Sequence, residues 1–120
     1  MELIKTNYQL RGIIESRIGG RSENQDSYGY TTTPLGVAVV VCDGMGGLRG
    51  GRWASTIAVS TILNYLLSVD EDANPAEVLA YAIKQANYEI IRVGQENPEL
   101  AGMGTTVTAL IINNRCATIA

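Results

Sequence analysis

Two aspartates stand where their carboxylates could hold a metal ion. Asp43 follows the apolar run 37–42 and precedes the glycine-rich segment 44–51, and Asp26 lies beside another strand-like segment. A carboxylate that leaves a buried strand, next to glycines that allow close approach to backbone carbonyls, offers the oxygen ligands that Mg²⁺ or Mn²⁺ prefers. Taken alone, an Asp-Gly pair after a strand is more often an ordinary turn.

Basic side chains near these aspartates could bind phosphate. They are Arg17, Arg21, Arg49 and Arg52. Guanidinium groups fit phosphate oxygens, so arginines beside cation-binding carboxylates suggest metal-assisted phosphoester chemistry. The usual alternative for each arginine is a solvated surface position. The glycine segment could instead cradle a nucleotide phosphate, although it lacks a Walker lysine and the glycine spacing of dinucleotide-binding loops.

Composition narrows the classes of function. The chain has 120 residues, enough for one domain, and a net charge of −3, which argues against a nucleic-acid partner. It contains no histidine, the commonest general base and metal ligand. Cys42 and Cys116 lie in apolar stretches without metal-site spacing, so we expect two buried thiols in a reducing compartment.

Neither the longest uncharged run nor the first residues of the chain resemble a membrane-spanning segment or a signal peptide. The longest uncharged run, residues 53–69, is shorter and more polar than a span of ~20 apolar residues. The first residues lack the apolar core of a signal peptide. We therefore expect a cytoplasmic protein with no membrane partner.

Hydrophobic periodicity predicts the elements that position these groups. Strands are expected at residues 8–17, 27–33, 36–42, 105–112 and 115–120, and helices at about 52–69 and from 75 to 94. Strands joined by hairpins, with the helices grouped together, predict an antiparallel α+β architecture.

Local signals define some boundaries of these elements. Asn74 is an expected N-cap, Pro75 the first helical residue and Glu77 its capping-box acid, while Gly94 is a candidate C-terminal cap. The pair at residues 113–114 suits a two-residue hairpin turn. The side chains at positions 45 and 53, a methionine and a tryptophan, are interpreted as packing residues.

Four segments occur in order along the chain and carry a family resemblance. They are Arg-Ser-Glu-Asn-Gln-Asp at 21–26, Val-Val-Cys-Asp-Gly-Met-Gly-Gly at 40–47, Ala-Ser at 54–55 and Gly-Met-Gly-Thr-Thr at 102–106. Together they resemble the metal-dependent protein phosphatases, the type 2C serine/threonine phosphatases, in their bacterial form. The resemblance implies an antiparallel β-sandwich flanked by helices, an αββα fold. Residues 1–120 would be a partial domain, its N-terminal half.

The resemblance also implies roles for individual residues. Asp43 is expected to bridge two Mn²⁺ or Mg²⁺ ions with the Gly44 carbonyl as a further ligand, and Asp26 to contact the metal site directly or through water. Arg21 would bind the substrate phosphate, so Asp43 and Arg21 are the expected catalytic residues. A water between the ions would attack phosphorus without a phosphoenzyme. The implied function is signalling dephosphorylation of phosphoserine and phosphothreonine proteins, opposing a serine/threonine kinase.

Several positions depart from the family pattern. Gln25 stands where some members have glutamate, Leu48 where bacterial members often have histidine, and Arg52 where an acid is common. The later metal-binding aspartates of the family are absent. Asp26 and Asp43 supply two negative charges against four on two divalent ions, so we expect little or no activity from these 120 residues alone.

Half of a two-sheet sandwich would leave apolar strand faces uncovered and an open edge at residues 118–120. This predicts self-association of the chain. The alternative function is a non-catalytic, phosphatase-like interaction module that works through protein contacts.

Overall fold

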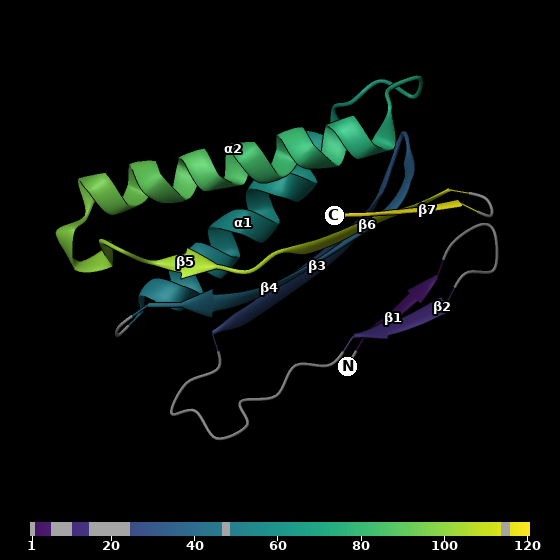
Figure 1. The fold of residues 1–120 in the computed structure, drawn as a ribbon. Coiled ribbons are helices and arrows are strands. Elements are labelled where there is room, and N and C mark those ends of the chain that lie inside the picture. The colour runs from purple at the N-terminus through teal and green to yellow at the C-terminus, as the bar shows by residue number, and fades with distance from the viewer. Residues whose placement is uncertain (1, 6–10, 15–24, 47–48, 114–115) are drawn as a thin grey trace.

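The computed structural model describes residues 2–5, 11–14, 25–46, 49–113 and 116–120. The elements, in chain order, are β1 (Glu2–Lys5), β2 (Arg11–Ile14), β3 (Asp26–Thr33), β4 (Gly36–Met45), α1 (Gly50–Leu67), α2 (Pro75–Glu96), the 3₁₀ turn η1 (Pro98–Leu100), β5 (Gly104–Thr105), β6 (Thr108–Asn113) and β7 (Cys116–Ile119). In Figure 1, α1 and α2 lie on one side of the larger sheet and the β1–β2 hairpin lies on the other.

The larger sheet is antiparallel and is built around β4. Its strand order is β3-β4-β6-β7, and the short β5 pairs with the end of β4. β3 pairs with β4 from Asp26↔Asp43 to Thr33↔Gly36, while β6 pairs with the middle of β4. This confirms the predicted antiparallel α+β architecture, with both helices on one face of the sheet.

Alternate residues of β4 form the core with α1. Ala38, Val40 and Cys42 are fully buried, as are Ala58 and Ile62 of the helix. β-Branched and small apolar residues suit a strand covered by a helix, because they pack closely against its apolar face. The side chains between them point to the opposite face of the sheet.

That opposite face, which we call the outer face, is apolar and partly exposed. Tyr30 of β3, Val41 of β4 and Ile119 of β7 share it by strand register, and all three are exposed. Ile119 is 71% exposed on the edge strand β7. The open edge expected at the C-terminal strand is therefore present.

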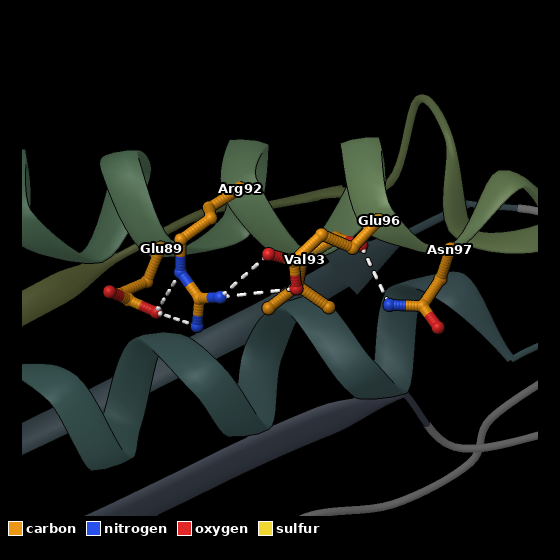
Figure 2. A network of polar contacts seen from close by, with 5 residues as sticks. All are labelled: Glu89, Arg92, Val93, Glu96 and Asn97. Carbon is orange, nitrogen blue, oxygen red and sulfur yellow. Dashed lines mark hydrogen bonds and ion pairs between the residues drawn. The ribbon is translucent and has the colours of Figure 1, made fainter.

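α2 begins as predicted but ends later. The Asn74 side chain accepts a hydrogen bond from the Glu77 N–H at 3.1 Å, and Pro75 is the first helical residue. The C-cap prediction at Gly94 is wrong, because the helix continues to Glu96 and the Asn97 side chain donates to the Val93 carbonyl at 2.9 Å. Figure 2 shows this contact beside Arg92.

An ion-pair network on the exposed surface of α2 spans the last turns of the helix. Arg92 lies 2.8 Å from Glu89 and 3.1 Å from Glu96, as Figure 2 shows. Spacings of three and four residues bring these side chains together on one helix face. Beyond these ion pairs, the Asn97 side chain caps the end of the helix, two residues past Gly94.

Three further expectations are corrected by the structure. Cys42 is buried, but Cys116 is exposed because it is the first residue of the edge strand β7. Neither cysteine forms a disulfide. Met45 and Trp53 are 56% and 50% exposed, so they are not core packing residues. Trp53 lies on the exposed side of the first turns of α1, whose other side is buried, and Met45 is the last residue of β4.

The N-terminal strand prediction is tested only in part. Within residues 8–17, the structure describes β2, and it adds a partner strand, β1, that the periodicity did not indicate. The rest of that predicted strand lies outside the described residues, as does Asn114 of the predicted hairpin turn. Of the helices described, none is long and apolar enough to cross a membrane.

Candidate metal site

The two aspartates singled out in the sequence meet across neighbouring strands. Asp26 opens β3, Asp43 lies near the end of β4, and the register pairs them directly. Directly paired residues point to the same face of a sheet with Cβ atoms about 5 Å apart. Because Cys42 faces α1, both carboxylates belong to the outer face, where each is partly buried.

Glycines at the end of β4 and the start of α1 allow the two elements to approach closely, on the face of the sheet opposite the two carboxylates. A Cβ at Gly44 would collide with the backbone oxygen of Gly51, and one at Gly51 would collide with the side-chain oxygen of Gln25. The structure corrects the expected loop here: β4 continues through Gly44 to Met45, and α1 starts at Gly50. These two glycines serve close packing, whereas Gly46, with φ of +148°, serves the turn between strand and helix.

The Gly-Met-Gly-Thr-Thr segment lies against the other side of the same strand end. β5 pairs with β4 through Gly44↔Thr105, and the Thr106 N–H donates to the Asp43 carbonyl at 2.9 Å. In return, the Asp43 N–H donates to the Thr106 hydroxyl at 3.1 Å. The Asp43 backbone is thus fixed between β3 and residue 106, which positions its carboxylate.

A hydroxyl cluster ties α1 to the start of β3. The fully buried Ser55 donates from its hydroxyl to the Gln25 carbonyl at 2.8 Å and lies 2.8 Å from the Ser27 hydroxyl. Thr56 lies 3.3 Å from the same Ser27 hydroxyl. Neither Ser27 nor Thr56 was predicted from sequence, although a serine directly after Asp26 was an available signal. The cluster holds the backbone on both sides of Asp26.

The donor set of the acid pair fits a hard divalent cation. Asp26, Asp43 and the Gly44 carbonyl are oxygen donors, the type that Mg²⁺ and Mn²⁺ prefer. Like charges directly opposite on paired strands repel, and a bound cation would offset this repulsion. Within the described ranges, no group of three or more acidic, cysteine or histidine side chains is placed to hold a metal. The metal-binding role of Asp26 and Asp43 therefore stays a prediction, with which their pairing is compatible.

Among the predicted phosphate-binding arginines, the structure places two. Arg49 and Arg52 are exposed at the start of α1, whereas Arg17 and Arg21 lie outside the described residues. Leu48 also lies outside them. The phosphate-binding role of Arg21 therefore stays a prediction from sequence.

The buried thiol next to Asp43 is unsuited to nucleophilic catalysis. Burial raises the pKa of the Cys42 thiol to about 11. Its hydrogen bond with Thr105 lowers the same pKa by a smaller amount. Because the thiolate is the nucleophile, a thiol with this pKa is inert near neutral pH. Cys42 is therefore not a candidate nucleophile.

Known proteins match both the sequence and the fold. A family model described as protein phosphatase 2C matches residues 15–120. The serine/threonine phosphatase stp of Listeria monocytogenes is 34% identical over 97 residues, which cover 78% of this chain and 35% of that protein.

Two solved structures match the fold at lower identity. A bacterial serine phosphatase has a TM-score of 0.77 and 26% identity, covering 88% of this chain and 44% of that one. The catalytic domain of the phosphatase PstP, described in complex with two manganese ions, has a TM-score of 0.69 and 26% identity, covering 82% and 41%.

The chain thus spans less than half of the length of these relatives. The family match extends over nearly all of it, and the conserved fold is the antiparallel sheet with its two helices. On these grounds, the chain belongs to the protein phosphatase 2C family.

Proposed function

We propose that the complete domain is a metal-dependent phosphatase that hydrolyses phosphoserine and phosphothreonine in proteins. The observation that carries the proposal is the direct pairing of Asp26 with Asp43 at the end of β4. The names of the relatives, which are serine/threonine phosphatases, support the same substrate class.

The residues of this chain would contribute one side of the reaction site. Asp26, Asp43 and the Gly44 carbonyl would hold Mn²⁺ or Mg²⁺, two ions in the complete domain. When bound, such ions act as Lewis acids and generate a nucleophile at neutral pH. Arg21 would bind the phosphate oxygens as a guanidinium fork. With no histidine in the chain, no imidazole of these residues protonates the leaving group.

The 120 residues should bind metal weakly and show little turnover. Two carboxylates leave two of the four charges of two divalent ions uncompensated, and among the described residues no third acidic, cysteine or histidine side chain is placed to join them. Manganese titration by calorimetry, with hydrolysis of p-nitrophenyl phosphate and a phosphothreonine peptide, tests this. Robust manganese-dependent turnover by the 120 residues alone would contradict it.

Variants of the complete domain separate metal binding from phosphate binding. Asp43→Asn should abolish manganese binding, while Arg21→Gln should leave manganese binding intact and raise KM for the phosphorylated substrate. Equal, negligible effects of both changes would exclude the roles assigned here. No manganese-dependent hydrolysis by the wild-type complete domain would exclude the phosphatase function itself.

A second candidate function rests on the outer face. Its exposed Tyr30, Val41 and Ile119 form an apolar surface next to the open edge of β7. Such surfaces and edges promote pairing between chains, so the 120 residues would self-associate or act as a non-catalytic interaction module. Light scattering over a range of concentrations tests this, and a monomer at high concentration would contradict it.

The cellular setting also belongs to the proposal. A phosphatase for phosphoserine and phosphothreonine would oppose a serine/threonine kinase, and the free thiols in the described residues are compatible with a reducing cytoplasm. Fractionation of cells and phosphoproteomics of a deletion strain test both points. Unchanged phosphorylation, or protein outside the cytoplasm, would contradict them.

A further inference from the structure

The side of α1 that faces away from the core carries no charge. Residues 53–69 include no acidic or basic side chain, although the exposed side of a surface helix is usually charged or polar. Ile62 is fully buried on one side of the helix, yet Trp53 and Leu67 are each 50% exposed on the other. A surface without charges that presents a tryptophan is typical of the core of a protein interface.

Five residues form a continuous stripe along this exposed side, which we call the α1 seam. They are Trp53, Ile57, Ser60, Asn64 and Leu67; Ile57 is half-buried and the other four are exposed. Their spacing alternates between four and three residues, which is the repeat that lets one helix pack along another in a coiled coil. At 1.5 Å per residue the seam is about 21 Å long. It can therefore accept a second helix along its length.

We propose that the α1 seam binds the same seam of a second copy of the chain, with the two helices antiparallel. The stripe is nearly symmetric about Ser60, because Trp53 lies seven positions before it and Leu67 seven positions after it. With a two-fold axis at Ser60, each Trp53 would pack against Leu67 of the second copy. Ile57 would lie beside Asn64 of the second copy, and the small Ser60 side chains would let the helices approach closely.

The charges at the two ends of α1 favour the antiparallel orientation. The exposed Arg49 precedes the helix, whose first turn contains no acid, and the turn after the helix has the sequence Asp-Glu-Asp at residues 70–72. An antiparallel pair would bring the basic end of each copy toward the acidic turn of the other, whereas a parallel pair would bring like charges together. This attraction depends on the sign of the charge at each end and not on one particular ion pair.

Tyrosines of α2 extend the uncharged surface beside the seam. The ring centroids of Tyr65 and Tyr81 are 5.0 Å apart, so Tyr81 lies against α1. Tyr88 follows seven positions later on the same side of α2, and the two α2 tyrosines are 48% and 64% exposed. Arg92, four positions after Tyr88, is already balanced by two glutamates of the same helix. The second copy would cover part of these aromatic rings.

The α1 seam is separate from the other surfaces discussed above. In Figure 1 the helices lie on one side of the larger sheet. The outer face and the acid pair belong to the opposite side. Dimerisation through the seam therefore does not depend on the proposed phosphatase function, and it can be separated by substitution from association through the outer face.

The oligomeric state of the 120-residue chain in solution tests the proposal. One helix pair forms a small interface, so we expect a dimer with a Kd of about 10–100 µM. Sedimentation velocity over concentrations that span this range measures the Kd. Trp53, the single tryptophan, would become covered in the dimer, so its fluorescence emission should shift to shorter wavelength as the dimer forms. A chain that stays monomeric over this range, or a dimer that leaves the Trp53 emission unchanged, would overturn the proposal.

Substitutions assign the dimer to the seam. Ser60→Arg would place two like charges opposite one another at the two-fold axis and should raise the Kd at least about tenfold. Ala80→Arg adds the same side chain at an exposed position of α2 outside the seam and should leave the Kd unchanged. Ile119→Lys on the outer face should also leave it unchanged, and circular dichroism checks that all variants are folded. Dimerisation of Ser60→Arg as tight as that of the wild type would reject the seam, as would loss of the dimer in Ile119→Lys.

Charge reversal and crosslinking test the antiparallel orientation. Asp72→Lys should raise the Kd about threefold to tenfold, while Glu99→Lys, which changes the net charge equally at another exposed position, should not raise it. In a Cys116→Ser background, a short bismaleimide should link Ser60→Cys chains into dimers but not Ala80→Cys chains, since the remaining Cys42 is buried. Equal effects of the two charge reversals, or no crosslinking through position 60, would reject the antiparallel dimer.

Discussion

The two helices begin in opposite ways. α2 starts with signals of its own: the Asn74 side chain accepts the Glu77 N–H, Pro75 is the first residue and Glu77 supplies an acid in the first turn. α1 has Arg49 as its N-cap residue, with no side-chain cap hydrogen bond and no acid in the first turn. Glycine follows at positions 50 and 51, which is unfavourable for a helix.

Tertiary contacts replace the missing local signals at the start of α1. Gly51 packs against Gly44 and Gln25, and Ser55 binds the Gln25 carbonyl from a fully buried position. The same contacts position the acid pair. The difference teaches that the start of α2 is set by its own sequence, whereas the start of α1 is set by tertiary contacts with β3 and β4.

Exchanging glycine for alanine in each helix should sharpen this comparison most. Gly51→Ala should reduce the free energy of unfolding by about 2 kcal/mol, because the added Cβ overlaps Gln25 and the backbone of Gly44. Gly94→Ala should raise it by about 0.5–1 kcal/mol, since its Cβ would lie 3.5 Å from the nearest atom, the Leu100 carbonyl oxygen. Urea denaturation measures both, and changes of the same sign would break the comparison.

Removal of the buried hydroxyl of α1 should have the next largest effect. Ser55→Ala should cost about 1–2 kcal/mol of unfolding free energy, because Ser55 binds Gln25, Ser27 and the Arg52 carbonyl. The Gln25 carbonyl keeps one bond, from the Gly44 N–H at 3.2 Å, which limits the loss.

The neighbouring hydroxyl is the matched control for Ser55. Thr56→Ala removes an exposed group and should cost less than about 0.5 kcal/mol in the same urea titration. If both variants lose equal stability, the buried contact with β3 is not what supports the start of α1.

The N-cap of α2 should show a local effect of intermediate size. Asn74→Ala should cost about 1 kcal/mol, because the Glu77 N–H loses its acceptor, and Asn74→Ser should restore most of the loss. Thermal unfolding followed by circular dichroism measures both variants. A loss as large as that of Gly51→Ala would show that α2 also depends on more than its own capping residues.

The surface ion pairs of α2 should have the smallest effect. Arg92→Gln breaks the contacts with Glu89 and Glu96, which are solvent-exposed and contribute little to stability. Any decrease in melting temperature should disappear in about 1 M NaCl, where charges are screened. A decrease that persists in salt would point to a structural role for the network beyond electrostatics.

Much of the fold follows from local sequence patterns. The apolar run in β4 and the capping residues of α2 act over a few neighbouring residues, so these elements were predicted near their observed positions. The position of Asp43 directly after that run also identified the acid without a structure. The family resemblance added metal-binding roles for Asp26 and Gly44. The pairing of β3 with β4 is compatible with these roles but does not test them.

Other features depended on contacts between distant residues. Gly94 continues a helix because the Asn97 side chain caps the Val93 carbonyl, and Cys116 is exposed because its strand lies at the edge of the sheet. The exposure of Trp53 likewise depends on which side of α1 packs against the sheet, since Ala54 and Ser55 next to it are fully buried. The residue type and its spacing along the sequence do not show which distant residues will surround these three positions in the fold.

The sequence by itself determined the strand and helix types, the start of α2 and the residues able to bind a hard cation, because these depend on side-chain chemistry and short-range periodicity. The tertiary structure decided that Asp26 faces Asp43, that residues 104–106 flank the same strand end and that Ser55 connects α1 to Gln25. The register between β3 and β4 and the close packing of Gly44 against Gly51 bring these residues together. Both are contacts between elements that are distant in the sequence, so they form only in the folded chain.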